Sequence, residues 1–191
     1  MDSIAYFAYG SNMLRQRLQH RGVKLLGVGR SASIAGYSLA FNKNSSDRSS
    51  KANLMRAAGQ TSWGVLFSVE SGSLAGLDAT EGSPDHYYRA TVTVQTDDGA
   101  RDAMTYLAQP KMVMENPDQP WDWYLALVLA GAKACPGMPS SWIEHVRSIG
   151  QSKPHTRKPP SSSFTEAVAQ LKTAGYDKWQ ELLHNTTESK P

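Results

Sequence analysis

The sequence has little cysteine: Cys135 is the one cysteine among 191 residues. A lone cysteine excludes an internal disulfide framework, and no group of cysteine and histidine has the spacing of a zinc site. The beginning of the chain also lacks a basic segment, and the apolar run from Ile4 to Ala8 is too short for a signal peptide or a membrane span. We therefore expect a cytoplasmic protein that binds no metal and does not associate with membranes.

Acidic residues are scarce between Leu14 and Gln60, where Asp47 alone accompanies nine lysines and arginines. From Thr61 to Ala130 the balance reverses, with ten acids against three cations. A basic half of this kind occurs in nucleic-acid-binding proteins. No nucleic-acid motif accompanies the charge, however. We expect one folded domain to bring the two halves together so that their charges offset each other, and we expect no nucleic-acid partner.

The first half of the chain has the pattern of strands with two short helices. Strands are expected at residues 4–9, 23–28, 37–41, 53–57, 63–69, 88–95 and 103–108. A polar loop is expected at 42–50, and Asp97-Asp98-Gly99 is typical of a hairpin turn. Leu14 and Leu18 predict a short amphipathic helix, and a second helix is expected over 71–81.

The second half predicts helices. Residues 121–134 are apolar on most sides, which indicates a buried helix, and Ser141 with Glu144 and Ser163 with Glu166 have the spacing of capping boxes. We expect an α+β fold with a mixed, barrel-like sheet and flanking helices. The expected division is a domain over 1–150, a linker or mobile loop over 151–163, and a helical C-terminal extension over 164–191.

Residues 9–12, Tyr-Gly-Ser-Asn, form the first candidate site. A buried strand that passes through Gly10 into a helix brings unpaired backbone N–H groups to one point, where the helix dipole is positive. Such a turn binds anions, and glycine lets a ligand approach the backbone. The alternative is that Ser11 or Asn12 only caps the helix. The lack of a phosphate-loop lysine favours a ligand smaller than a nucleotide, such as a carboxylate.

Glu81 forms the second candidate site. It lies seven residues after Leu74 and four after Leu77, so it shares their inward face in the last turn of the expected helix. The helix dipole and burial both disfavour a charged carboxylate there, which suits a group that exchanges protons near neutral pH. The alternative is a frayed helix end with Glu81 in water. Asp78 shares the inward face, and periodicity does not choose between the two acids.

The order and spacing of several segments resemble the gamma-glutamylcyclotransferases and their relatives. The segments are YFAYGSNM at 6–13, WGVL at 63–66, LDATEG at 77–82, YR at 88–89, TYL at 105–107 and GAK at 131–133, with KAN at 51–53 similar to bacterial members. The similarity covers residues 4 to 149.

This resemblance implies an enzyme that cyclises a γ-glutamyl group to 5-oxoproline, as in glutathione metabolism, and that needs no cofactor. Residues Tyr9, Gly10, Ser11 and Asn12 would hold the γ-glutamyl group through their backbone. Glu81 would be the catalytic acid and base, in preference to Asp78. Tyr88 would line the pocket, with Tyr87 as the neighbouring alternative.

Three alternatives remain open at this stage. The first is an enzyme that cleaves a γ-glutamylamine or a biosynthetic γ-glutamyl intermediate. The second is a non-catalytic ligand-binding member of the fold, and the third is a nucleic-acid-binding protein that uses the basic half. Residues Cys135 and His86 are expected to be a core thiol and a plain loop histidine. The expected partner is a small γ-glutamyl molecule, and homodimerisation is left open.

Overall fold

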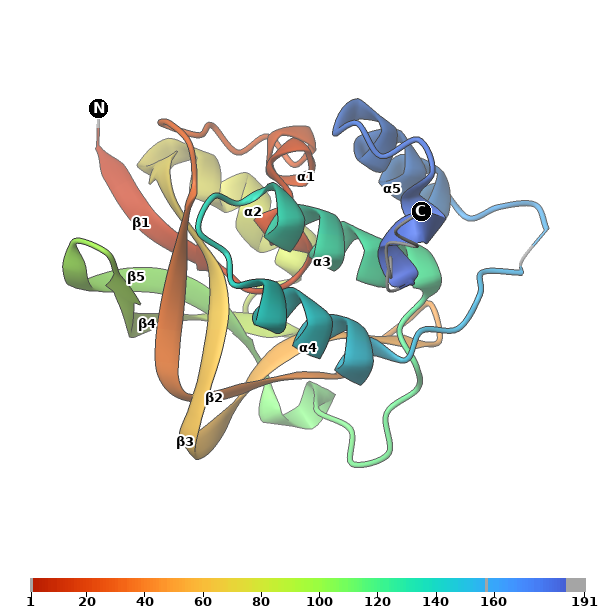
Figure 1. Ribbon diagram of the computed structural model, residues 1–191, viewed down its shortest axis with the longest axis horizontal. Helices are drawn as coiled ribbons and strands as arrows, with labels where there is room; N and C mark the ends of the chain where they lie inside the picture. The colour runs from red at the N-terminus through yellow and green to blue at the C-terminus, as the bar shows by residue number, and fades with distance from the viewer. Residues whose placement is uncertain (1, 157, 185–191) are drawn as a thin grey trace, which may run out of the picture.

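The computed structural model of the chain, described here for residues 2–156 and 158–184, is built around a closed β-barrel (Figure 1). Its strands are β1 (Ser3–Ala8), β2 (Arg30–Ser45), β3 (Ser49–Glu70), β4 (Tyr87–Thr96) and β5 (Gly99–Ala108), and they neighbour one another in the order β1-β3-β2-β4-β5. Strands β1 and β3 pair antiparallel, whereas β1 meets β5 in parallel at Tyr6 and Met104, which closes the barrel. The α+β prediction with a mixed, barrel-like sheet is confirmed.

Five α-helices flank the barrel within the described residues. They are α1 (Arg15–His20), α2 (Leu74–Glu81), α3 (Asp122–Ala134), α4 (Ser140–Gly150) and α5 (Ser162–Thr173), and short 3-10 turns cover Ser11–Met13, Ser71–Ser73, Pro110–Met112 and Trp179–Leu183. Helix α3 is buried from Trp123 to Ala132, as its all-round apolar pattern predicts. It packs on the turn Ser11–Met13, on α4 and on α5, so it supports the end of β1 from behind.

One strand prediction of the first half is wrong, and two others prove to be parts of a single strand. Residues 23–28 form no strand, because Gly27 takes a φ of 126° and interrupts the extended run before β2; only Leu25 bridges Val69. The runs at 53–57 and 63–69 belong to one long strand, β3. The expected loop at 42–50 shrinks to a turn, since Asn44 pairs with Ser50 and Ser45 with Ser49.

The helix starts also differ from the expected capping boxes. Helix α4 begins after Pro139 without a side-chain cap, and α5 begins at Ser162, where the Ser161 hydroxyl accepts from the Phe164 amide at 3.2 Å. Helix α5 packs against α1 and α3. Residues 185–191 of the expected extension lie outside the described residues.

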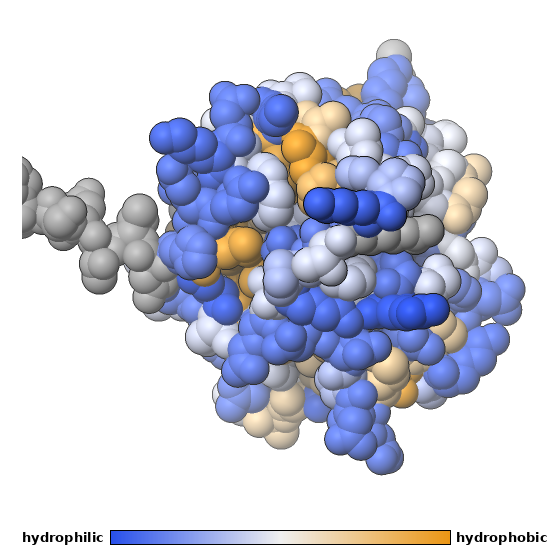
Figure 2. All heavy atoms as spheres, turned by 90° about the vertical axis from the view of Figure 1, so that its right-hand side faces the viewer, coloured by the Kyte–Doolittle hydropathy of each residue, from blue (hydrophilic) through white to orange (hydrophobic). Residues whose placement is uncertain are grey.

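The face of the molecule on the right of Figure 1 is mostly hydrophilic, with small, separate hydrophobic areas (Figure 2). Among the described residues, no helix combines the length and apolar character that a membrane crossing would require.

Candidate functional site

The turn after β1 is the first part of the candidate site. Pairing of β1 with β3 ends at Ala8, and the chain then passes through Gly10 into the 3-10 turn Ser11–Met13. Within residues 2–156 and 158–184, the N–H groups of Gly10, Ser11 and Asn12 donate to no acceptor, and the next N–H, that of Met13, bonds the Gly10 carbonyl at 2.9 Å. Three adjacent donors are therefore free for a ligand. The three donors lie at the start of a short 3-10 turn and not of an α-helix. The site therefore attracts anions through these N–H groups, without the dipole of a long helix.

Helix α3 holds this turn from behind through a glycine. A Cβ placed on Gly131 would lie 2.4 Å from the Leu14 amide nitrogen and 2.5 Å from the Met13 carbonyl carbon. No side chain larger than hydrogen fits between the helix and the backbone of the turn. The contact explains why a glycine interrupts an otherwise apolar helix, and it keeps the free amides in place.

Asn12 does not cap a helix. Leu14 precedes α1, and no side chain caps either the 3-10 turn or α1. The Asn12 Nδ2 instead donates to the Tyr6 hydroxyl at 2.8 Å and to Glu81 Oε1 at 2.9 Å, while Arg21 Nη1 donates to Asn12 Oδ1 at 2.8 Å. The capping alternative is therefore wrong for Asn12, whose amide links the β1 turn to α2.

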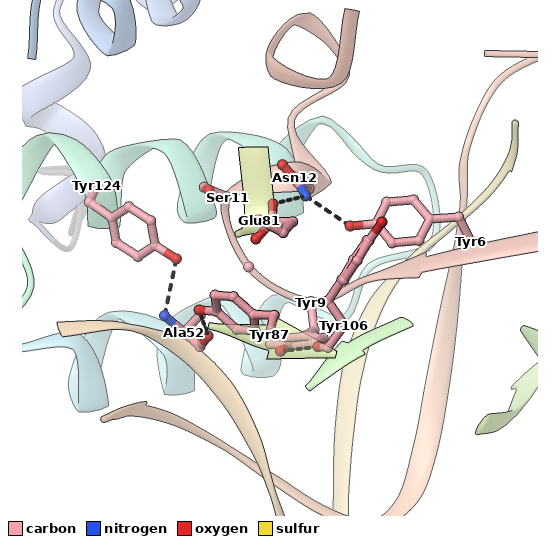
Figure 3. Close-up of a pocket in the computed structure, with 10 residues that line it drawn as sticks. Tyr6, Tyr9, Ser11, Asn12, Ala52, Glu81, Tyr87, Tyr106 and Tyr124 are labelled. Atoms are coloured by element: carbon pink, nitrogen blue, oxygen red, sulfur yellow. Dashed lines mark hydrogen bonds between the residues drawn. The ribbon is translucent and has the colours of Figure 1, made fainter. Parts of the chain in front are cut away.

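Glu81 ends α2 and faces the cavity. Gly82 follows in the left-handed conformation at φ 62°, which stops the helix immediately after this residue. The Glu81 side chain is 13% exposed, and its Oε1 accepts from Asn12 and forms an ion pair with Arg21. Figure 3 shows the carboxylate beside Asn12 and Ser11, on the side of the pocket opposite Ala52 and Tyr87. The frayed-end alternative for Glu81 is excluded.

Asp78 occupies a different environment from Glu81. Its carboxylate accepts from Arg89 Nε at 2.8 Å and Nη2 at 2.5 Å, and from the Tyr106 hydroxyl at 2.7 Å. The Arg89 and Tyr106 hydrogen bonds outweigh partial burial and lower the pKa of Asp78. Asp78 does not line the pocket, whereas Glu81 does. The structure thus separates two acids that helical periodicity leaves equivalent.

Tyr87, rather than Tyr88, lines the pocket. Tyr87 is 7% exposed and donates its hydroxyl to the Ala52 carbonyl at 2.8 Å, whereas Tyr88 is 37% exposed and lies outside the pocket lining. Neighbouring side chains of a strand point to opposite faces of the sheet. An error of one residue along β4 therefore exchanges the side chain that faces the pocket for the one that faces away. The prediction for Tyr88 is corrected by one position.

Five of the ten residues that line the pocket are tyrosines: Tyr6, Tyr9, Tyr87, Tyr106 and Tyr124. Burial raises the pKa of each of them, and the negative charge of Glu81 adds to the increase for Tyr6 and Tyr9. Their hydroxyls therefore stay protonated at neutral pH. Those of Tyr9, Tyr87 and Tyr106 donate hydrogen bonds, whereas those of Tyr6 and Tyr124 accept them. Tyr9 donates to the Tyr106 carbonyl at 2.5 Å, and the Ala52 amide donates to Tyr124 at 3.0 Å (Figure 3).

These groups enclose a cavity of about 40 Å³, lined by the β1 turn, the tyrosines, Ala52 and Glu81. A second, larger cavity of about 320 Å³ adjoins it and shares Ser11, Glu81, Tyr87 and Tyr124 as lining residues. We call the first the inner cavity and the second the outer chamber. Among the described residues, no group of three or more histidine, cysteine or acidic side chains is arranged to hold a metal ion.

Sequence reasoning missed Arg21, the ionic partner of Glu81, and did not assign Tyr6, Tyr106 or Tyr124 to the site. Arg21 is the C-cap residue of α1 and follows other basic residues, and no local pattern distinguishes it. Cys135 lies outside both cavities that meet at Glu81, and burial raises its pKa to about 11, which agrees with a core thiol. His86, expected to be a plain loop residue, lines the outer chamber.

Replacement of Gly10 is expected to obstruct the inner cavity. A Cβ at this position lies 3.0 Å from the Ala52 Cβ and 3.5 Å from the Tyr124 hydroxyl, so the branched side chain of Gly10→Val must displace one of them. We expect ligand affinity to fall by about tenfold or more, since overpacking typically costs 1–3 kcal/mol. Gly72→Val is the control, because a Cβ at Gly72 meets nothing within 4 Å. Equal affinity of both variants, measured by calorimetry, would contradict the expectation.

A family model described as "Gamma-glutamyl cyclotransferase, AIG2-like" matches residues 6–125. The matched range contains the β1 turn, Glu81 and Tyr87. The chain belongs to this gamma-glutamyl cyclotransferase, AIG2-like family, and the membership supports a cyclotransferase role.

Individual relatives agree with this placement. Gamma-glutamylcyclotransferase of Bos taurus is 27% identical over 155 residues, covering 78% of this chain and 79% of the relative. Gamma-glutamylcyclotransferase of Homo sapiens is 28% identical over 158 residues, with the same coverage. Among solved structures, a gamma-glutamyl cyclotransferase shares the fold with a TM-score of 0.69 at 24% identity, covering 86% of this chain and 97% of its own. The structure of YkqA from Bacillus subtilis matches with a TM-score of 0.68 at 26% identity, and the match covers 81% of this chain and 57% of YkqA.

Proposed function

We propose that the protein is a gamma-glutamylcyclotransferase that converts γ-glutamyl amino acids or peptides to 5-oxoproline and the free amine. The observation that carries the proposal is the position of the Glu81 carboxylate, which lines the same small cavity as the three free amides of Gly10, Ser11 and Asn12. The names of the bovine and human relatives support the same activity.

The reaction is intramolecular. The α-amino nitrogen of the substrate attacks its own γ-carbonyl carbon, the new C–N bond closes a five-membered ring, and the original C–N bond to the leaving amine breaks. Holding the two groups in near-attack geometry supplies a large part of the acceleration. The buried tyrosine wall suits this task, because its rings are fixed by hydrogen bonds to the backbone at Ala52 and Tyr106.

Glu81 serves as the acid and base in this scheme. The α-amino group of the substrate is mostly protonated at neutral pH, since such groups titrate at about 8 in peptides. The Glu81 carboxylate removes one proton from the ammonium before attack and delivers it to the departing nitrogen as the C–N bond breaks. It then removes the second proton from the ring nitrogen and passes it to the released amine, which leaves as an ammonium, so the protons balance over one turnover and Glu81 returns to its carboxylate form. Asn12 and Arg21 hold the Oε1 atom of Glu81, which orients the carboxylate toward the cavity.

The free amides of the β1 turn supply the remaining requirement. The tetrahedral intermediate carries a negative oxygen, and backbone N–H groups aimed into a site from which water is excluded stabilise such an oxygen strongly. The substrate's α-carboxylate needs similar donors. Three adjacent N–H groups are enough to serve one of these anions and to contribute to the other.

The test is to incubate the purified protein with γ-glutamyl dipeptides, γ-glutamylamines and glutathione, and to measure released 5-oxoproline. The matched control is an α-glutamyl dipeptide, in which the amide lies at the α-position and ring closure cannot expel the second residue. We expect 5-oxoproline from γ-linked substrates alone. Saturable binding of γ-glutamyl compounds without any 5-oxoproline would instead favour a non-catalytic binding member of the fold.

A further inference from the structure

The outer chamber meets the inner cavity at Glu81. Its lining shares Ser11, Glu81, Tyr87 and Tyr124 with the inner cavity, so one ligand can occupy both. Under the proposed function, on which this inference rests, the γ-glutamyl group occupies the inner cavity and reacts beside Glu81. The leaving amine then lies in the outer chamber, whose lining decides which amines are accepted.

Positive charge dominates this chamber. Glu81 is the one acid in its lining, against four cations: Arg17, Arg21, Lys43 and Lys51. Two of the four are already neutralised by carboxylates. Arg21 pairs with Glu81, and Lys51 donates to Asp47 at 2.7 Å and to the Ser49 hydroxyl at 2.8 Å. The remaining two, Arg17 and Lys43, form no ion pair with any carboxylate of the described residues.

Lys43 is a buried ammonium that forms no ion pair with a carboxylate among the residues that the structure describes. It is 5% exposed, its Nζ lies 3.4 Å from His86 Nδ1, and it lies 5.1 Å from the centre of the Tyr87 ring. Burial lowers the pKa of Lys43, and the more distant charges of Glu81 and Asp47 act in the opposite direction. An unpaired buried charge is unfavourable unless a ligand compensates for it.

Arg17 likewise forms no ion pair with a carboxylate of the described residues. Its Nη1 donates to the neutral amide of Gln170 at 3.0 Å, and its buried Nε has no acceptor among the described residues. Gln170 is itself buried and belongs to α5, so the C-terminal helix holds a guanidinium at the chamber wall. A guanidinium with donors to spare is suited to a carboxylate.

We propose that the outer chamber selects leaving amines that carry two carboxylates, such as a dicarboxylic amino acid, with Lys43 and Arg17 as the specificity-determining cations. Each unpaired cation receives one carboxylate of the leaving amine. Amines without a carboxylate leave both cations uncompensated, which disfavours γ-glutamylamines as substrates. The helix α5 contributes to this selectivity through its contact with Arg17.

The test compares two nearly isosteric substrates, γ-glutamylglutamate and γ-glutamylglutamine, with γ-glutamylethylamine as the uncharged reference. We expect kcat/KM to fall in that order, with a ratio of about tenfold or more between the first two, since a hydrogen bond to a charged group is typically worth 1.5–3 kcal/mol. Raising the ionic strength should reduce this ratio. These measurements use the unmodified protein and do not depend on any variant folding.

A variant pair then assigns the effect to the chamber. Lys43→Met leaves one unpaired cation for two carboxylates and should reduce the glutamate-to-glutamine ratio, whereas Lys111→Met, which removes an exposed lysine paired with Asp85 at 3.6 Å, should keep it. An unmodified protein that releases 5-oxoproline equally fast from both substrates would overturn this inference and leave the proposed function standing. Failure of every substrate to yield 5-oxoproline would remove the proposed function and this inference with it.

Discussion

Glu81→Gln is expected to reduce kcat for 5-oxoproline release by about 10²–10⁴-fold, the usual contribution of a positioned acid and base. The amide keeps the size of the side chain and one oxygen that can accept from Asn12, so the cavity retains its shape. It cannot accept the substrate's proton. Substrate binding should therefore survive, and calorimetry with an intact γ-glutamyl substrate can measure it because turnover is slow.

Asp78→Asn is the matched control for Glu81→Gln. It neutralises the other acid of α2, which pairs with Arg89 outside the inner cavity. Loss of a largely exposed ion pair costs at most about 1 kcal/mol, and kcat should change little. Near-normal kcat in Glu81→Gln, or an equally severe loss in Asp78→Asn, would show that the acid and base assignment is wrong.

Arg21→Met is expected to lower the free energy of unfolding by about 3 kcal/mol, because it leaves the Glu81 carboxylate buried without its counter-charge. The Arg21 and Glu81 side chains are 16% and 13% exposed, so water compensates only in part. The change also removes the donor to Asn12 Oδ1. Urea unfolding measures the loss, and a fall in kcat should accompany it as Glu81 loses its orientation.

A double-mutant cycle separates the ion pair from simple loss of packing. In Arg21→Met combined with Glu81→Gln, no unpaired charge remains, and we expect the double variant to recover part of the lost stability. Arg30→Met is the control, since Arg30 pairs with Asp98 at an exposed position where the two side chains are 47% and 62% accessible. A loss in Arg30→Met as large as that in Arg21→Met would contradict the role of burial.

The parts of the site that are local in the chain could be predicted well. The turn at Gly10 follows from an apolar run that ends in glycine, and the end of α2 follows from Gly82, which adopts a φ of 62°. The barrel-like sheet and the buried helix α3 follow from the lengths and periods of apolar runs. Each of these features depends on neighbouring residues, whose spacing is visible in the sequence.

The incorrect sequence predictions have a common physical origin. Tyr87 and Tyr88 are chemically identical neighbours, so nothing local fixes which one faces inward, and the phase is set by pairing of β4 with β5. The expected strand at 23–28 does not form, because Gly27 takes a φ of 126°, which the apolar pattern of these residues does not reveal. The spacing of residues along the chain indicates which side chains share one face of a helix or strand. It does not indicate which other part of the protein packs against that face.

The sequence by itself determined the chemistry on offer: a glycine turn with free amides, an acid at the end of a helix, and an excess of cations in the first third of the chain. Only the tertiary structure decided which of these groups act together. It pairs Arg21, which follows α1, with Glu81 of α2, and it pairs Asp78 with Arg89 outside the inner cavity. It also placed Lys43 of β2 and Arg17 of α1 beside the same chamber, where neither forms an ion pair with a carboxylate of residues 2–156 and 158–184. Contacts between residues far apart in the chain depend on how the barrel closes and how the helices pack on it, and no short-range pattern encodes either.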